Sequence, residues 1–156
     1  MRRVEYGVVG VLTGVMTLLT LVQVVMRYVF NDSLIWSEEA VRYLFVWVAL
    51  IGAGAAVGHG THYGLEAAHR YVTPRVRAVL GFLATLVVLA FVLALFTTGI
   101  REAVLAARQS SLTMPIRMHW AYAAIPVGAA LMLWHLALGW LRFGFGHHPL
   151  ERTENP

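Results

Sequence analysis

The residues best suited to chemistry lie between positions 59 and 69, where three histidines and one acid recur at helical spacing. His59, His62, Glu66 and His69 stand at positions i, i+3, i+7 and i+10, so a helix would place them on one face. Imidazole and carboxylate groups are ligands for zinc and related metals. The same composition is also typical of a solvated segment just past a membrane span. These four residues are therefore weak candidates for a metal site.

A further histidine, His135, lies inside an apolar stretch near the C-terminus. It either contacts a neighbouring helix or pairs with His59 as a haem ligand, since both would lie toward the same side of a membrane. A haem held between helices needs two ligands that face each other at the same depth. A haem-binding membrane anchor of a respiratory oxidoreductase is therefore the alternative function.

Other kinds of active site find no support in the sequence. The chain has no GxxxxGK[ST] motif for nucleotide phosphates and no HExxH motif for zinc. It has no cysteine, which excludes disulfides, thiolate metal sites and cysteine nucleophiles. We expect a protein that is not an enzyme and carries no cofactor.

The composition is that of a membrane protein. Hydrophobic residues make up 59% of 156 and charged residues 13%, against about 25% charged in soluble domains. All 12 basic residues are arginines, and the net charge is +4. This pattern indicates loop arginines that meet anionic membrane lipid, and it does not indicate a nucleic-acid partner.

The hydropathy pattern predicts an all-α membrane protein with four transmembrane helices. Each apolar stretch approaches the roughly 20 residues that cross a hydrocarbon core. We expect one domain over residues 1–143, followed by a polar, disordered tail over residues 144–156. The spans are expected at residues 7–26, 40–57, 76–98 and 119–141.

Two features modify the last two spans. Ile100, Ala103, Val104 and Ala107 share one helical face, which predicts an amphipathic extension of the third helix along the membrane interface. After a loop over residues 109–118, Pro126-Val127-Gly128 is expected to kink or loosen the fourth helix.

The second helix begins with an acidic cluster. Ser37 is a plausible N-cap, and carboxylates in a first turn suit the positive end of the helix dipole. Glu38 precedes Arg42 by four residues, the favourable order for an ion pair within a helix. We expect Glu38 to neutralise Arg42, which leaves Glu39 for the helix dipole or for a partner protein. The alternative is that both acids merely mark an exposed helix start.

Small residues cluster on one face of each of the first two helices. Such faces let another helix backbone approach closely. They serve either the internal packing of the four helices or the docking of a partner membrane protein. The residues are Gly10, Thr13, Gly14, Thr17 and Thr20 in the first helix, and Gly52, Gly54, Ala55 and Gly58 in the second.

Several motifs in this order resemble one known family. These are Arg27-Tyr28-Val29-Phe30-Asn31, then Leu34-x-Trp36-Ser37-Glu38-Glu39-x-x-Arg42, then Trp47 and Gly52-Ala53, Gly60-Thr61-His62, Pro74, Ser110-Ser111-Leu112 with Pro115, and Ala124-Ile125-Pro126-Val127-Gly128. Over residues 20–141 the chain resembles the small permease subunit of tripartite ATP-independent periplasmic (TRAP) transporters, the DctQ-like family.

The resemblance implies a non-catalytic four-helix subunit. Its partners would be a large TRAP permease subunit, which carries the substrate and ion sites, and a periplasmic solute-binding protein that delivers an organic acid anion. The residues that this resemblance and the helix patterns assign to partner contact or structure are Trp36, Glu38, Glu39, Arg42, Gly52, Gly54, Gly58, Pro126 and Gly128.

The expected location is the bacterial inner membrane, with several membrane passes. Placing both termini in the cytoplasm puts seven arginines inside and five outside. That arrangement satisfies the positive-inside rule by a small margin.

Overall fold

The computed structural model describes residues 2–57 and 73–143. Four helices in this part are long and apolar enough to cross a membrane, which confirms the predicted fold class. They are α1 (Arg2–Val29), α2 (Ile35–Val57), α4 (Pro74–Ala106) and α6 (Ala124–Phe143), with the single-turn helix α5 (His119–Tyr122) directly before α6. The expected tail, residues 144–156, lies outside the described residues.

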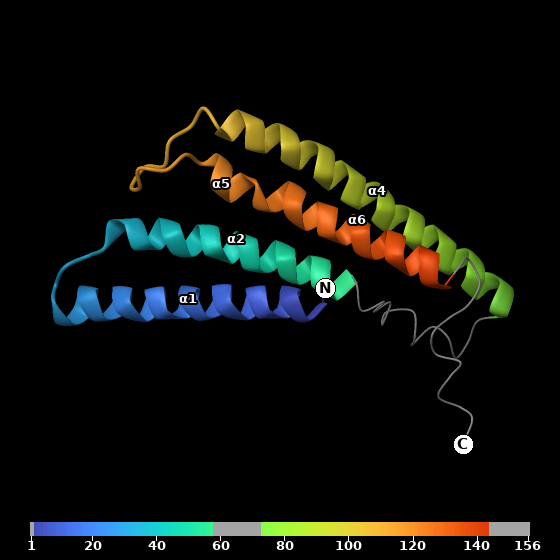
Figure 1. Ribbon diagram of the computed structural model, residues 1–156, viewed down its shortest axis with the longest axis horizontal. Helices are drawn as coiled ribbons and strands as arrows, with labels where there is room; N and C mark the ends of the chain where they lie inside the picture. The colour runs from blue at the N-terminus through green and yellow to red at the C-terminus, as the bar shows by residue number, and fades with distance from the viewer. Residues whose placement is uncertain (1, 58–72, 144–156) are drawn as a thin grey trace, which may run out of the picture.

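The four long helices form one open layer in the order α1, α2, α6, α4 (Figure 1). α2 packs between α1 and α6, and α6 packs between α2 and α4. α1 and α4 are therefore the two edges of the layer, so each packs along one side only. The layer consists of two antiparallel helix pairs, α1–α2 and α4–α6, which meet where α2 lies beside α6 (Figure 1). Among the residues that the structure describes, both broad faces of this layer are open to lipid or to another protein.

The edge helix α1 meets α2 through one narrow stripe. Most of the less exposed residues along α1 alternate at spacings of four and three, namely Glu5, Val9, Leu12, Met16, Leu19, Gln23 and Met26, with Thr13 beside them. This is the heptad spacing by which two helices pack side by side at a small crossing angle. The rest of the α1 surface is exposed within this chain, including Val11, Leu18 and Leu21.

The third long helix, α4, continues to Ala106 without a break, so the predicted extension after residue 98 is part of the same helix. At 33 residues it is about 50 Å long, well beyond the roughly 30 Å of hydrocarbon it must cross. Gly99 lies so close to α6 that an added Cβ would stand 2.7 Å from Ile125. Thr98 hydrogen-bonds to the Ala94 carbonyl in its own helix. These contacts keep Thr97-Thr98-Gly99 helical, although a glycine favours a helix end.

Candidate functional site

The short connection between α1 and α2 closes in a defined helix cap. Asn31 has a φ of 52°, in the left-handed region. The Asp32 N–H donates to the Met26 carbonyl at 3.1 Å. A left-handed residue at the end of a helix, followed by an N–H that bonds back to a carbonyl of the last turns, is a common way to satisfy the free carbonyls there. The geometry of this turn therefore depends on Asn31, a residue type that tolerates positive φ.

The predicted N-cap at Ser37 is wrong. α2 begins at Ile35, two residues earlier, so Ser37 already lies within the first turn. Its hydroxyl donates to the Leu34 carbonyl at 2.6 Å, and its side chain is fully buried. The hydroxyl therefore satisfies a carbonyl before the helix and does not cap the free N–H groups.

The predicted pairing of Glu38 with Arg42 is also wrong. Glu38 lies 4.0 Å from Arg27 in the last turn of α1, and both side chains are more than half exposed. Arg42 is exposed and forms no ion pair among the residues the structure describes. The Glu38–Arg27 pair joins the two helices of the α1–α2 hairpin, although an exposed pair at this distance contributes little stability.

Glu39 holds the loop between α4 and α5 against the start of α2. Its carboxylate accepts hydrogen bonds from the hydroxyls of Tyr43 and Thr113. The Thr113 backbone N–H donates to the same carboxylate at 3.1 Å. Glu39 is consequently 9% exposed. The prediction that it faces a partner or the helix dipole is wrong, because a loop of the same chain occupies it.

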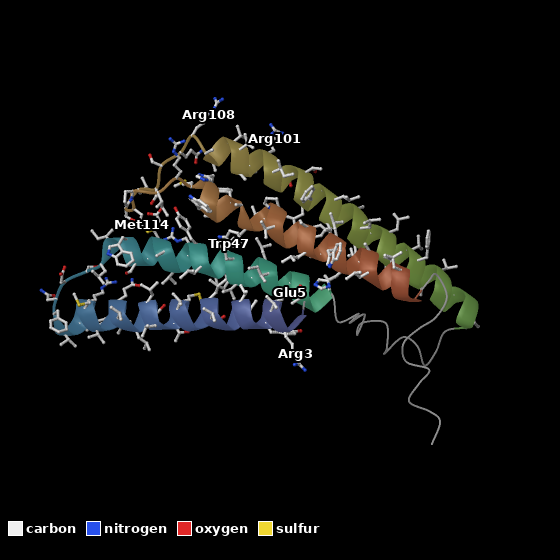
Figure 2. The ribbon with its side chains drawn as sticks, viewed as in Figure 1. Arg3, Glu5, Trp47, Arg101, Arg108 and Met114 are labelled. Carbon is white, nitrogen blue, oxygen red and sulfur yellow. The ribbon has the colours of Figure 1, made fainter. Side chains whose placement is uncertain are left out.

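The loop that Glu39 holds is itself closed by backbone bonds. The Ser111 N–H donates to Ile116 at 2.8 Å, and the Met118 N–H donates to Gln109 at 3.0 Å. Figure 2 shows Met114 at the tip of this loop, beside the first turns of α2. Leu112 is 90% exposed, although its loop is well fixed. No local pattern signals this contact, since Glu39 and Thr113 are 74 residues apart in the sequence.

A second bond ties the same end of the layer together. The Trp47 side chain on α2 donates its Nε1–H to the Trp120 carbonyl in α5 at 3.0 Å. This carbonyl lies where the helix is interrupted at Ala123, between α5 and α6. Pro126 explains the interruption: it has no N–H to donate to the Tyr122 carbonyl four residues earlier. The predicted loosening at Pro126 is therefore found one turn before the proline.

The predicted small residues of α2 and α6 have different surroundings. An added Cβ at Gly54 would stand 3.0 Å from Leu131, and one at Gly128 would stand 2.7 Å from Leu50. These two glycines therefore serve internal packing. An added Cβ at Gly52 would meet nothing within 4 Å, and Trp36 is 43% exposed. Gly58 lies outside the described residues.

The small face of α1 is open within this chain. Added Cβ atoms at Gly10 and Gly14 would meet nothing within 4 Å. The hydroxyls of Thr17 and Thr20 donate to carbonyls of α1 itself, at 2.9 Å in each case. Internal packing therefore does not account for this face.

A buried pair that the sequence reasoning missed joins α1 to α6. His135 Nε2 lies 3.0 Å from each carboxylate oxygen of Glu5. This confirms His135 as a histidine that contacts another helix. The contact with Glu5 occupies Nε2, one of the two ring nitrogens that could bind iron in the haem alternative. The proposed second ligand, His59, lies outside the described residues, as do His62, Glu66 and His69. Glu5 is the only acidic residue before the first predicted span, and this was the one signal of the pair in the sequence.

Three relatives place these features in context. The chain is 34% identical over 88 residues to the C4-dicarboxylate TRAP transporter small permease protein of Vibrio cholerae, a match that covers 56% of this chain and 38% of the relative. It is 27% identical to the sialic acid TRAP transporter small permease protein of the same species, covering 71% of this chain and 64% of the relative.

A third relative is the sialic acid TRAP transporter permease protein of Haemophilus influenzae. It is 31% identical over 111 residues, covering 71% of this chain but 18% of the relative. In all three relatives the match spans less than two thirds of their length. Because residues 16–143 also match the DctQ component of tripartite ATP-independent periplasmic transporters, this chain belongs to that family.

Proposed function

We propose that this chain is a non-catalytic scaffold, the small membrane subunit that braces a larger, ion-coupled TRAP permease subunit during uptake of an organic acid anion. The observation that carries the proposal is the open layer of helices, whose two broad faces remain uncovered by the described parts of the chain, residues 2–57 and 73–143. A single layer cannot enclose a transport path, but it presents a long apolar surface against which another membrane protein can pack.

The chemistry of the described spans supports this role. Carriers keep ionisable or polar groups near the middle of the membrane to bind substrate and coupling ions. Here Glu39 is occupied by its own loop and His135 by Glu5. Arg42 lies on the exposed side of α2, within two turns of its start. Substrate and ion sites are therefore expected on the larger subunit.

The relative sizes support a larger partner. The Haemophilus influenzae permease protein contains a match to this chain over 18% of its length. Most of that permease lies outside the match to this chain. We infer that a large permease unit of this kind packs against the helices described here.

The proposed setting is the bacterial inner membrane, with both termini in the cytoplasm and membrane lipid on the uncovered surfaces. In this orientation the 109–118 loop faces the periplasm. The loop presents Leu112 on a backbone fixed by Glu39, which suits a contact with a periplasmic solute-binding protein. Neither a cofactor nor a nucleic-acid partner is part of the proposal.

Reconstitution tests the scaffold role. In liposomes, the chain alone should support no uptake of a C4-dicarboxylate or a sialic acid, with or without a sodium gradient. Uptake should require the large subunit and the binding protein encoded with this chain. Affinity purification of the tagged chain in mild detergent should recover a large polytopic subunit. Gradient-driven uptake by the chain alone, or its purification without such a subunit, would overturn the proposal.

A further inference from the structure

The buried Glu5–His135 pair has no part in the proposed scaffold surface. The two side chains are 10% and 7% exposed, and they come from residues 130 positions apart in the chain. Both Glu5 carboxylate oxygens lie 3.0 Å from His135 Nε2, so the carboxylate and the imidazole are within hydrogen-bond distance of each other. α1 otherwise packs on α2, and the pair reaches past α2 to α6.

Stability alone does not explain a buried carboxylate–imidazole pair at this position. Removing a carboxylate from water is costly, and well-packed apolar side chains of similar size are often as stabilising as a buried ion pair. A hydrogen-bonded pair differs from an apolar contact because it tolerates only a narrow range of distances and angles. The hydrogen-bonded pair therefore contributes mainly by fixing the position of α1 relative to α6.

The stripe of residues by which α1 packs on α2 does not by itself fix the tilt and rotation of α1. Its members are mostly flexible, apolar side chains at a regular spacing, such as Leu12, Met16 and Leu19. A regular apolar stripe tolerates small changes of tilt and rotation, and buried polar groups are the usual means of fixing one arrangement. The cap at Asn31 fixes one end of α1, and Glu5 lies at the other end (Figure 2).

We propose that Glu5 and His135 form a clasp that fixes the N-terminal end of α1 against α6 and so sets the tilt of the edge helix in the layer. Figure 2 shows Glu5 beside the last described turn of α2, the place where α1 can reach α6. The last described turn of α2 carries three small residues, Gly54, Ala55 and Ala56, before Val57, and Ala55 is 1% exposed. Small side chains there leave room for the two long polar ones to meet.

Distance measurements between spin labels test the clasp in the full chain in lipid nanodiscs. The chain has no native cysteine, so Val8→Cys on α1 and Ala137→Cys on α6 label two exposed positions without background. The unaltered pair should give one narrow distance distribution. Glu5→Gln and His135→Gln should each broaden it, because the amide replaces one member of the carboxylate–imidazole hydrogen bond. Glu102→Gln, which alters an exposed carboxylate on α4, is the matched control and should leave it narrow.

Two double variants complete the test. Exchanging the partners, Glu5→His with His135→Glu, should restore a narrow distribution, since the same pair can form in reverse. Glu5→Leu with His135→Leu leaves no buried unpaired charge, so it should fold even where the single variants do not, yet give a broad distribution. A narrow distribution in the double leucine variant, or a broad one in the folded exchange variant, would overturn the clasp.

Discussion

At the scale of single residues, hydroxyl groups in the described spans are satisfied by their own helix. Thr20, Thr85 and Thr98 donate to carbonyls four residues earlier. Hydrocarbon offers no hydrogen-bond partner, so a side chain that bonds to its own backbone avoids an unsatisfied group. Long-range polar contacts are consequently few, and those made by Glu5 and Glu39 have a large structural effect.

Removing the Glu39 carboxylate should release the 109–118 loop. In Glu39→Ala, the Thr113 N–H and two hydroxyls lose their acceptor, and the loop loses its bonds to α2. We expect faster amide hydrogen exchange across residues 109–118 and a lower melting temperature. Glu38→Ala, which removes an adjacent exposed carboxylate, is the control and should change neither. Equal exchange rates in the two variants would show that Glu39 does not hold the loop.

At the scale of elements, α6 is the helix that joins the two hairpins. It packs on α2 through Gly128 and on α4 through Ile125 and Pro126, which lie against Gly99. The helices approach most closely where one of them lacks a Cβ, and dispersion contacts between the backbones then increase. The fully buried Ala129 and the nearly buried Met132 continue this contact toward Val92 on α4.

A methyl group at position 128 should separate α6 from α2. In Gly128→Ala, the new Cβ would stand 2.7 Å from the Leu50 Cβ and 3.0 Å from its carbonyl oxygen, so backbone must move. Overpacking of this kind costs about 1–3 kcal/mol in well-packed cores. We expect a lower melting temperature of the purified chain and weaker recovery of the large subunit.

Gly139→Ala is the matched control for this substitution. It makes the same chemical change in the same helix, where an added Cβ meets nothing within 4 Å. Its melting temperature should stay equal or rise, because alanine favours helix more than glycine. A loss of stability in Gly139→Ala as large as that in Gly128→Ala would show that close packing is not the cause.

At the scale of the whole molecule, the open layer exposes an unusually large share of its apolar side chains. Leu18, Val87 and Phe91 are each more than 60% exposed, and they come from both edge helices. Such surface is stable in lipid, where it needs no partner, and it is also available to another membrane protein. The layer is therefore suited to a brace, and its orientation decides which loops meet the periplasm.

Cysteine labelling should place both termini in the cytoplasm. Since the chain has no native cysteine, Asn31→Cys and Thr153→Cys each provide a single reactive site. In intact spheroplasts, an impermeant maleimide should label Asn31→Cys and leave Thr153→Cys unmodified. After the membrane is permeabilised, both should react, which controls for accessibility. The reverse pattern in intact cells would overturn the orientation, whose basis is a small excess of arginines on one side.

Hydropathy and motif order are local properties of the chain, so the sequence alone predicts a four-helix membrane protein of the DctQ-like family. It also predicts a weak point near Pro126, because proline has no N–H to donate. It left the role of Gly54 open between packing and docking and expected Gly128 to loosen its helix, whereas the close contacts of both glycines with neighbouring helices depend on tertiary structure. The pairing of charged groups likewise depends on tertiary contacts. Glu38 meets Arg27, Glu39 meets Thr113 and Glu5 meets His135, all across turns or between distant helices. The spacing along α2 favoured a pair between Glu38 and Arg42, but the free energy of such a pair is small. Folding brings Arg27 close to Glu38, and the structure contains that pair.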